Sequence, residues 1–287
     1  MSNFKKILKF IWNEFIYGGH LQSLSAMSII FVSGTLLKIQ ITWDLLFIVY
    51  LVFYVPYLHN RFKEINVDYL TNVKRTRHLR KYLKFVPIIF YFASFVLVIN
   101  LIYFSNFLAL IFGLLLLIFG IFYTTVFKKV TKKICLFKNI YVSIFFALLP
   151  FFLAVYYSCP LTNFLVVGVL VFAMFVFLKS FITQMFFDVK DVESDRKEGL
   201  CTFPIIMGKE KSIVLLSLFD FIITATMPIS FFYLNIFSEF ILILILTIPF
   251  DFYCYSLVKK KKYFGYILKS GEFFLWLFLI FVGKIIL

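Results

Sequence analysis

The feature that most constrains this chain is a series of long apolar runs, each about the length of a membrane-spanning helix. Crossing a hydrocarbon core of about 30 Å takes roughly 20 apolar residues in a helix. The composition agrees, because 63% of the 287 residues are hydrophobic, 43 are phenylalanine and the mean hydropathy is +0.99. A soluble domain of this length could not bury so much apolar and aromatic surface. The sequence therefore predicts a polytopic, all-α membrane protein.

We expect nine transmembrane helices in a single domain that covers residues 1–287. The expected spans are 22–39, 43–60, 83–104, 107–126, 139–158, 163–187, 212–232, 237–256 and 271–287. Residues 22–287 therefore form the predicted bundle. Residues 1–20 contain three lysines opposite Phe, Leu, Ile and Trp, which is typical of an interfacial helix. An extension of the first span is the alternative.

The distribution of basic residues predicts the orientation of the bundle. Of the 29 Lys and Arg residues, 26 fall in the N-terminal segment and in the connections 60–84, 127–138, 188–211 and 257–270. With nine spans these segments share one side, which the positive-inside rule makes the cytoplasmic side. We therefore expect the N-terminus to lie on the cytoplasmic side. We expect the protein to reside in the cytoplasmic membrane. Basic loops at the cytoplasmic face set the membrane topology and attract anionic lipid, and these two roles explain most of the net charge of +15. We therefore expect no nucleic-acid partner.

The four cysteines are scattered along the chain. Cys135, Cys159, Cys201 and Cys254 form no CxxC pair and no Cys/His metal-binding pattern. Buried free cysteines behave as small apolar residues. The pattern supports neither disulfides nor a zinc site, and we expect all four to be apolar fillers.

Topology does not explain two groups of acids in the cytoplasmic segments. One lies in "NRFKEINVD" after the second span, and the other in "DVKDVESD" after the sixth. Their ligand-type side chains are Asn60, Glu64 and Asp68 in the first group, and Asp188, Asp191 and Asp195 in the second. Spacings of i, i+4, i+8 and i, i+3, i+7 each place three side chains on one face of a helix. We therefore expect two acidic stripes at the same membrane face.

These stripes favour a divalent cation, because carboxylates repel one another at such spacings unless a cation compensates. Mg²⁺ prefers carboxylate oxygens and commonly shares its coordination shell with substrate phosphates. Metal binding would neutralise charge on a departing diphosphate, which is what ionising an allylic diphosphate requires. The aromatic spans below the acids could hold an isoprenoid tail and stabilise an allylic cation. We therefore predict that all six residues bind Mg²⁺ and diphosphate and are catalytic.

At these residues the chain resembles the UbiA superfamily of intramembrane prenyltransferases. The second stripe and its continuation, "DVKDVESDRKEGLCTFP", are similar to the family's second acidic motif and to the D-R-x-x-G-x-x-T-x-P run after it. The first motif is matched with two changes. Arg61 stands where the family usually has Asp, and Glu64 replaces the middle Asp. The resemblance covers about residues 20–287.

The resemblance also implies a phosphate-binding set. Arg75, seven residues after Asp68, falls where the family usually has a phosphate-binding arginine. The stretch from Tyr123 to Lys128 is similar to the family's Tyr-to-Lys/Arg stretch. The predicted diphosphate-binding residues are Arg61, Arg75, Lys128 and Lys197. For Arg61 the alternative is that it simply replaces a lost metal ligand.

The resemblance implies a nine-helix bundle whose active site faces the cytoplasm. Its expected activity is Mg²⁺-dependent transfer of a polyprenyl group from an isoprenyl diphosphate donor. The expected acceptor is aromatic and similar to a quinone precursor, or is another lipophilic molecule.

Two other functions are open alternatives. A UbiA-type terpene cyclase would ionise the same donor and use an internal double bond in place of the acceptor. A membrane transporter with acidic cation sites is a rival of another class, although such sites usually lie near the bilayer midplane. Asp220, Asp251 and Glu272 lie in or beside late spans, and the sequence leaves three alternatives open: one of them borders the acceptor pocket, they pair with Lys269, or they lie at the membrane interface.

Overall fold

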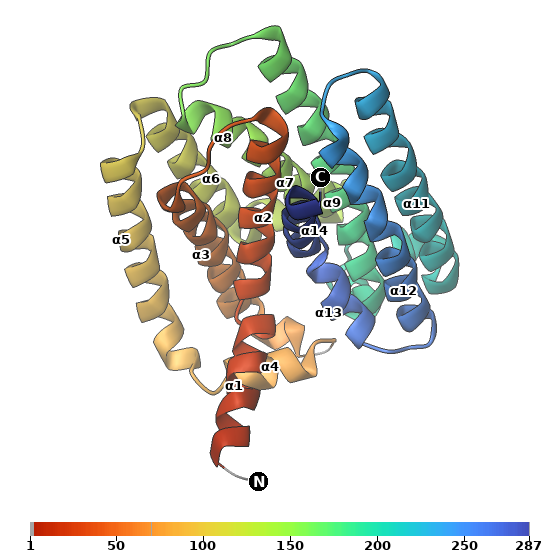
Figure 1. The fold of residues 1–287 in the computed structure, drawn as a ribbon. Coiled ribbons are helices and arrows are strands. Elements are labelled where there is room, and N and C mark those ends of the chain that lie inside the picture. The colour runs from red at the N-terminus through yellow and green to blue at the C-terminus, as the bar shows by residue number, and fades with distance from the viewer. Residues whose placement is uncertain (1–2, 70, 287) are drawn as a thin grey trace.

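In the computed structural model, which describes residues 3–69 and 71–286, the regular elements are all helices (Figure 1). The first half contains α1 (Asn3–Tyr17), α2 (His20–Leu37), α3 (Trp43–Asp68), α4 (Val73–Leu79), η1 (Leu83–Phe85), α5 (Val86–Phe104), α6 (Phe107–Thr125) and η2 (Phe127–Lys132). The second half contains α7 (Phe137–Ala147), α8 (Leu149–Tyr156), α9 (Asn163–Glu198), α10 (Phe203–Met207), α11 (Lys209–Tyr233), η3 (Glu239–Leu246), α12 (Thr247–Lys259), α13 (Phe264–Ser270) and α14 (Glu272–Ile286).

Seven helical segments of the described chain are long and apolar enough to cross a membrane. The pair α13 and α14, bent by 54° where the two helices meet, would make an eighth span, whereas the apolar helix Phe107–Tyr123 is shorter. These segments make the chain an integral membrane protein. The exact count of nine spans and the cytoplasmic N-terminus stay predictions.

The two helices that carry the acidic stripes extend beyond their apolar runs, as expected. Helix α9 has 36 residues and is about 54 Å long at 1.5 Å per residue. It begins where the Thr162 side chain accepts a hydrogen bond from the Leu165 amide, and it ends at Gly199 with φ 70°. Helix α3 likewise continues to Asp68. Both stripes therefore lie on continuous helix ends.

Helix α2 is packed against α3, α8, α9 and α14. It can approach them closely because Ser25, Ser28 and Ser33 are fully buried, small, and satisfied within the helix. Each hydroxyl donates to the carbonyl one turn earlier, at 2.9, 2.8 and 2.6 Å respectively. The Ser25 hydroxyl also lies 3.2 Å from the carbonyl of Ser270, at the α13–α14 bend. Helix α2 thereby supports the segment that bends beside the site.

Helix α1 projects from the end of the bundle at which α4 and α13 lie (Figure 1). Its Glu14 accepts a hydrogen bond of 3.0 Å from Tyr82 and lies 2.7 Å from His78 Nε2 on α4. Apolar side chains on its outer face, among them Ile11 and Trp12, are exposed. This arrangement ties α1 to α4, while its placement at the membrane interface stays a prediction.

Candidate active site

Helices α3 and α9 bring the two acidic stripes to one cavity of about 280 Å³. The residues that line it from these helices include Asn60, Arg61, Glu64, Asp188, Asp191 and Asp195. The sequence separates the two groups by more than a hundred residues, and the fold places both around one space. Asp68 ends α3, but its side chain lies outside the described part of the structure.

Asp188 is held by two donors from the start of α7. The Lys138 ammonium lies 2.7 Å from its Oδ1, and the Asn139 amide donates to its Oδ2 at 2.7 Å. Both Asp188 and Asn139 are fully buried, whereas Lys138 lines the cavity. Asp188 is therefore fixed in position, with one of its oxygens on a cation that faces the cavity.

Asp191 has a comparable arrangement. The Lys190 ammonium lies 2.9 Å from its Oδ2, and the Asn72 amide donates to its Oδ1 at 3.1 Å. Lys190 also donates to the Asn72 carbonyl oxygen at 3.1 Å, as does the hydroxyl of Tyr263. The segment before α4 and the segment before α13 thus meet at the second acid of the α9 stripe.

Asp195 differs from its two neighbours. Its side chain is only 5% exposed, and its Oδ2 has no hydrogen-bond partner among the described residues. A buried carboxylate oxygen left in this way is costly without a partner. Together with the carboxylates of Glu64, Asp188 and Asp191 it forms a set of hard oxygen donors around a cavity, which suits Mg²⁺.

The predicted phosphate-binding residues are not all brought together. Arg61 and Arg75 line the cavity, and the Arg61 guanidinium lies 4.6 Å from the centre of the Tyr57 ring. Lys197 is exposed and is not among the residues that line the cavity. The side chain of Lys128 lies outside the described residues. The roles of all four stay predictions.

Four residues that contact Asp188 or Asp191 were missed from the sequence, namely Asn72, Lys138, Asn139 and Lys190. Lys190 and Lys138 had been counted only as topology-setting basic residues. The available signal for two of them was the adjacent Lys-Asn pair at the inner end of an apolar run, where a buried amide would need a partner. The targets of Lys138, Asn139 and Asn72 could not be deduced, because the acids that they contact lie 49 residues or more away in sequence. Lys190, in contrast, is adjacent to its partner Asp191.

Aromatic side chains form part of the cavity wall. Tyr123, Phe145, Phe146 and Phe187 contribute to it from α6, α7 and α9. Apolar ring surfaces suit an isoprenoid tail, and ring faces can stabilise a nearby positive charge. The lining of the cavity therefore combines acidic, basic and aromatic side chains.

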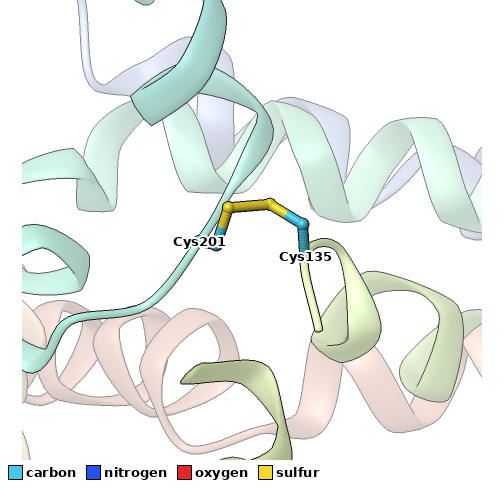
Figure 2. The surroundings of a disulfide bond; sticks show 2 residues. All are labelled: Cys135 and Cys201. Carbon is cyan, nitrogen blue, oxygen red and sulfur yellow. A yellow bond between two sulfur atoms is a disulfide. The ribbon is translucent and has the colours of Figure 1, made fainter. Parts of the chain in front are cut away.

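The expectation that no cysteine forms a disulfide was wrong. Cys135 and Cys201 are joined, with Cα atoms 4.7 Å apart (Figure 2). The Leu136 amide also donates to the Cys201 carbonyl at 3.2 Å, so the two segments of the chain are adjacent. Scattered spacing had hidden this pairing, because 66 residues separate the cysteines and only the fold brings them together. Cys159 and Cys254 are free, in line with the expectation for them.

A second charged cluster lies deeper, between the late helices. It consists of Lys179 on α9, Asp220 on α11, Asp251 on α12, and Lys269 and Glu272 at the α13–α14 bend, all 5% exposed or less. The Lys179 ammonium lies 2.5, 3.0 and 2.5 Å from the three acids in chain order. The Lys269 ammonium lies 2.5, 2.7 and 2.8 Å from the same three. Each carboxylate thus gives one oxygen to each lysine.

This arrangement decides among the alternatives that the sequence left open for the late acids. All three pair with Lys269. The three acids are close enough to hold a metal, with ligand atoms within 4.8 Å of one another. Two ammonium groups, however, already contact all six carboxylate oxygens. We refer to these five residues as the charge cage.

The comparison with protein families settles the class of the protein. A sequence model of the UbiA prenyltransferase family matches residues 23–278, which include both acidic stripes and every helix from α3 to α13. The chain belongs to the UbiA prenyltransferase family. It is therefore an enzyme, a membrane-embedded prenyltransferase, as the motifs had indicated.

One curated UbiA relative matches in part. Digeranylgeranylglyceryl phosphate synthase of Methanosphaera stadtmanae is 32% identical over 94 residues. The match spans 32% of this chain and 34% of that enzyme, about a third of its length.

Two solved structures share the UbiA fold. An apo UbiA homolog from Aeropyrum pernix K1 superposes with a TM-score of 0.70 at 14% identity, over 92% of this chain and 97% of the other. A structure concerning digeranylgeranylglyceryl phosphate synthase in membranes gives a TM-score of 0.56 at 19% identity, over 97% and 100%. At such identities the two structures establish the fold alone.

Proposed function

We propose that this UbiA-family enzyme transfers a prenyl group from an isoprenyl diphosphate to a lipophilic acceptor in a Mg²⁺-dependent reaction at the cavity between α3 and α9. The observation that carries the proposal is that both acidic stripes line one cavity with aromatic walls. An anionic headgroup and an apolar tail need these two surroundings in one place. The active site is proposed to face the cytoplasm.

The proposed metal-binding residues are the predicted six: Asn60, Glu64, Asp68, Asp188, Asp191 and Asp195. Magnesium bound by them would neutralise the negative charge of the diphosphate as it leaves. Arg61 and Arg75, which line the cavity, supply fixed positive charge for the phosphate oxygens. The aromatic walls exclude water and present their faces to the allylic cation.

The acceptor class is the open part of the proposal. An aromatic acceptor is the prediction from sequence. The partial relative is named for a glyceryl phosphate that carries two geranylgeranyl groups, which favours testing a glyceryl phosphate lipid in parallel.

Product analysis tests the proposal. Purified protein in lipid nanodiscs is given geranylgeranyl diphosphate and Mg²⁺ with an aromatic acceptor, with a geranylgeranylglyceryl phosphate, or with no acceptor. Transfer supports the proposal and names the acceptor, whereas a cyclised hydrocarbon without acceptor indicates the terpene cyclase. A protein that releases no diphosphate under any Mg²⁺ condition contradicts the proposal and leaves the transporter. Mass spectrometry of copurifying lipids gives an independent reading of the donor or product.

A further inference from the structure

Two of the carboxylates proposed to bind the metal already form ion pairs with lysines. Lys138 lies 2.7 Å from Asp188, and Lys190 lies 2.9 Å from Asp191. Both ion pairs are largely shielded from solvent, since the side chains of the two lysines are 22% and 13% exposed. Both lysines also line the cavity in which a diphosphate would bind.

These ion pairs make the binding of a divalent cation without diphosphate unfavourable. To bind Asp188 or Asp191 it must take an oxygen from an ammonium group, and the displaced ammonium then lies beside another cation in a shielded space. A diphosphate removes that difficulty, because its oxygens accept the ammonium hydrogens that the carboxylates give up. The lysines therefore oppose the metal alone and favour the metal together with its anion.

Building on the proposed function, we propose that Lys138, supported by Lys190, makes metal and diphosphate binding mutually dependent by exchanging a carboxylate partner for a phosphate partner. Lys138 holds Asp188 before the donor arrives and binds phosphate oxygen afterwards. Coupling of this kind is reciprocal, so the diphosphate raises metal affinity by the same factor by which the metal raises diphosphate affinity. The enzyme then binds its donor already complexed with metal.

Asn139 is what allows Lys138 to leave. It donates 2.7 Å to the other oxygen of Asp188 and is fully buried, so the carboxylate keeps one fixed partner throughout. On the neighbouring acid, Asn72 has the same role for Asp191 at 3.1 Å. Each acid thus has one amide that fixes its position and one lysine that can exchange partners.

Direct binding measurements on the wild-type protein and on Lys138→Met test the inference. Free Mn²⁺ is measured by electron paramagnetic resonance as a substitute for Mg²⁺, with and without inorganic pyrophosphate. In Lys138→Met, Mn²⁺ alone should bind about tenfold more tightly, the size expected for one charge-assisted contact, because its competitor is gone. The gain from pyrophosphate should fall by about tenfold, because the exchanging donor is gone.

The two shifts have opposite signs, and a merely structural lysine would not produce them. If Lys138→Met binds Mn²⁺ alone as weakly as the wild-type protein or more weakly, the inference is wrong. Lys138→Arg keeps the charge and should behave like the wild-type protein. Lys133→Met, an exposed lysine five residues away, is the matched control and should change neither affinity.

Two further variants keep the test decisive if Lys138→Met does not fold, as judged by thermal unfolding. Lys138→Gln can still donate to Asp188 without a charge, and Lys190→Met tests the neighbouring pair; both should show the same opposite shifts. Turnover of geranylgeranyl diphosphate by the wild-type protein is scored separately. Turnover without the opposite shifts rejects only this inference, whereas metal and pyrophosphate binding without turnover rejects only the proposed function.

Discussion

Helix α9 contributes to two acid clusters that have little else in common. Lys179 belongs to the charge cage, and about 14 Å further along the helix, at 1.5 Å per residue, Asp188 begins the stripe at the cavity. In the cage two ammonium groups contact all six carboxylate oxygens, and none of its five residues lines the cavity at the stripe. At the stripe the lysines contact one oxygen each of Asp188 and Asp191, and Asp195 Oδ2 has no hydrogen-bond partner among the described residues.

The difference teaches that acids in a membrane protein act according to what surrounds them. Carboxylates whose oxygens are all paired hold helices together, because removing any partner leaves a buried charge. Carboxylates beside a cavity can exchange partners and so can bind a ligand. The cage joins α9, α11, α12 and the α13–α14 bend, and it thereby supports the helix that carries the stripe.

The largest expected effect separates the two clusters by activity. Asp191→Asn should lower the rate of diphosphate release from geranylgeranyl diphosphate by more than about a hundredfold, since it removes charge from the proposed metal site. Asp251→Asn, in the cage, should leave that rate unchanged per folded molecule. The comparison breaks if both variants lose the same activity per folded molecule.

The second effect separates the clusters by stability. Lys179→Met should lower the free energy of unfolding by about 3–5 kcal/mol, the usual cost of removing one partner from a buried ion pair. Thermal or denaturant unfolding in detergent measures the loss. Lys211→Met, an exposed lysine on α11, is the control and should change it little. A Lys179 variant as stable as the control would mean that the cage does not hold the late helices together.

The third effect concerns the Cys135–Cys201 disulfide, which lies near the stripe and not in the cage. The disulfide joins the start of α7, which supplies Lys138 and Asn139, to the chain just after α9. Cys135→Ser should lower the free energy of unfolding by about 2–4 kcal/mol, since the link closes a long loop. Dithiothreitol should bring the wild-type protein to the same value, and Cys159→Ser should leave it unchanged. No response of the wild-type protein to reductant would show that the bond does not stabilise this end.

The smallest expected change in stability concerns Glu14, a partly exposed acid outside both clusters. Burial raises the pKa of Glu14, but hydrogen bonds from His20, His78 and Tyr82 lower it, and the net pKa lies below the usual 4.5. The carboxylate therefore contributes stability that is present above pH 4.5 and is lost as the pH falls through the lowered pKa. Glu14→Gln should cost about 1 kcal/mol at neutral pH.

Unfolding of both proteins across the acidic range checks this pH dependence. The difference between the wild-type protein and Glu14→Gln should shrink as the pH falls below 4.5. A difference that is constant with pH would show that α1 is not held to α4 by the ionised carboxylate.

The sequence by itself determined the membrane class, most of the helical segments and the two acidic stripes. Apolar runs are local, and their lengths are set by the thickness of the hydrocarbon core. Spacings such as that of Asp188, Asp191 and Asp195 are also local, because a helix repeats every 3.6 residues. The family followed from the same motifs, and the match over residues 23–278 confirmed it.

The tertiary structure decided which charged groups pair. Lys138 and Lys190 were indistinguishable in the sequence from other cytoplasmic-side lysines, and Cys135 and Cys201 from the free cysteines. Whether Asp220, Asp251 and Glu272 bordered a pocket or paired with lysine was equally open. Apart from the adjacent pair Lys190–Asp191 and the i,i+3 pair Lys269–Glu272, these outcomes depend on contacts between segments far apart in the chain. The free energy of a buried charge or thiol is set by all its neighbours in space, most of which are not neighbours in sequence.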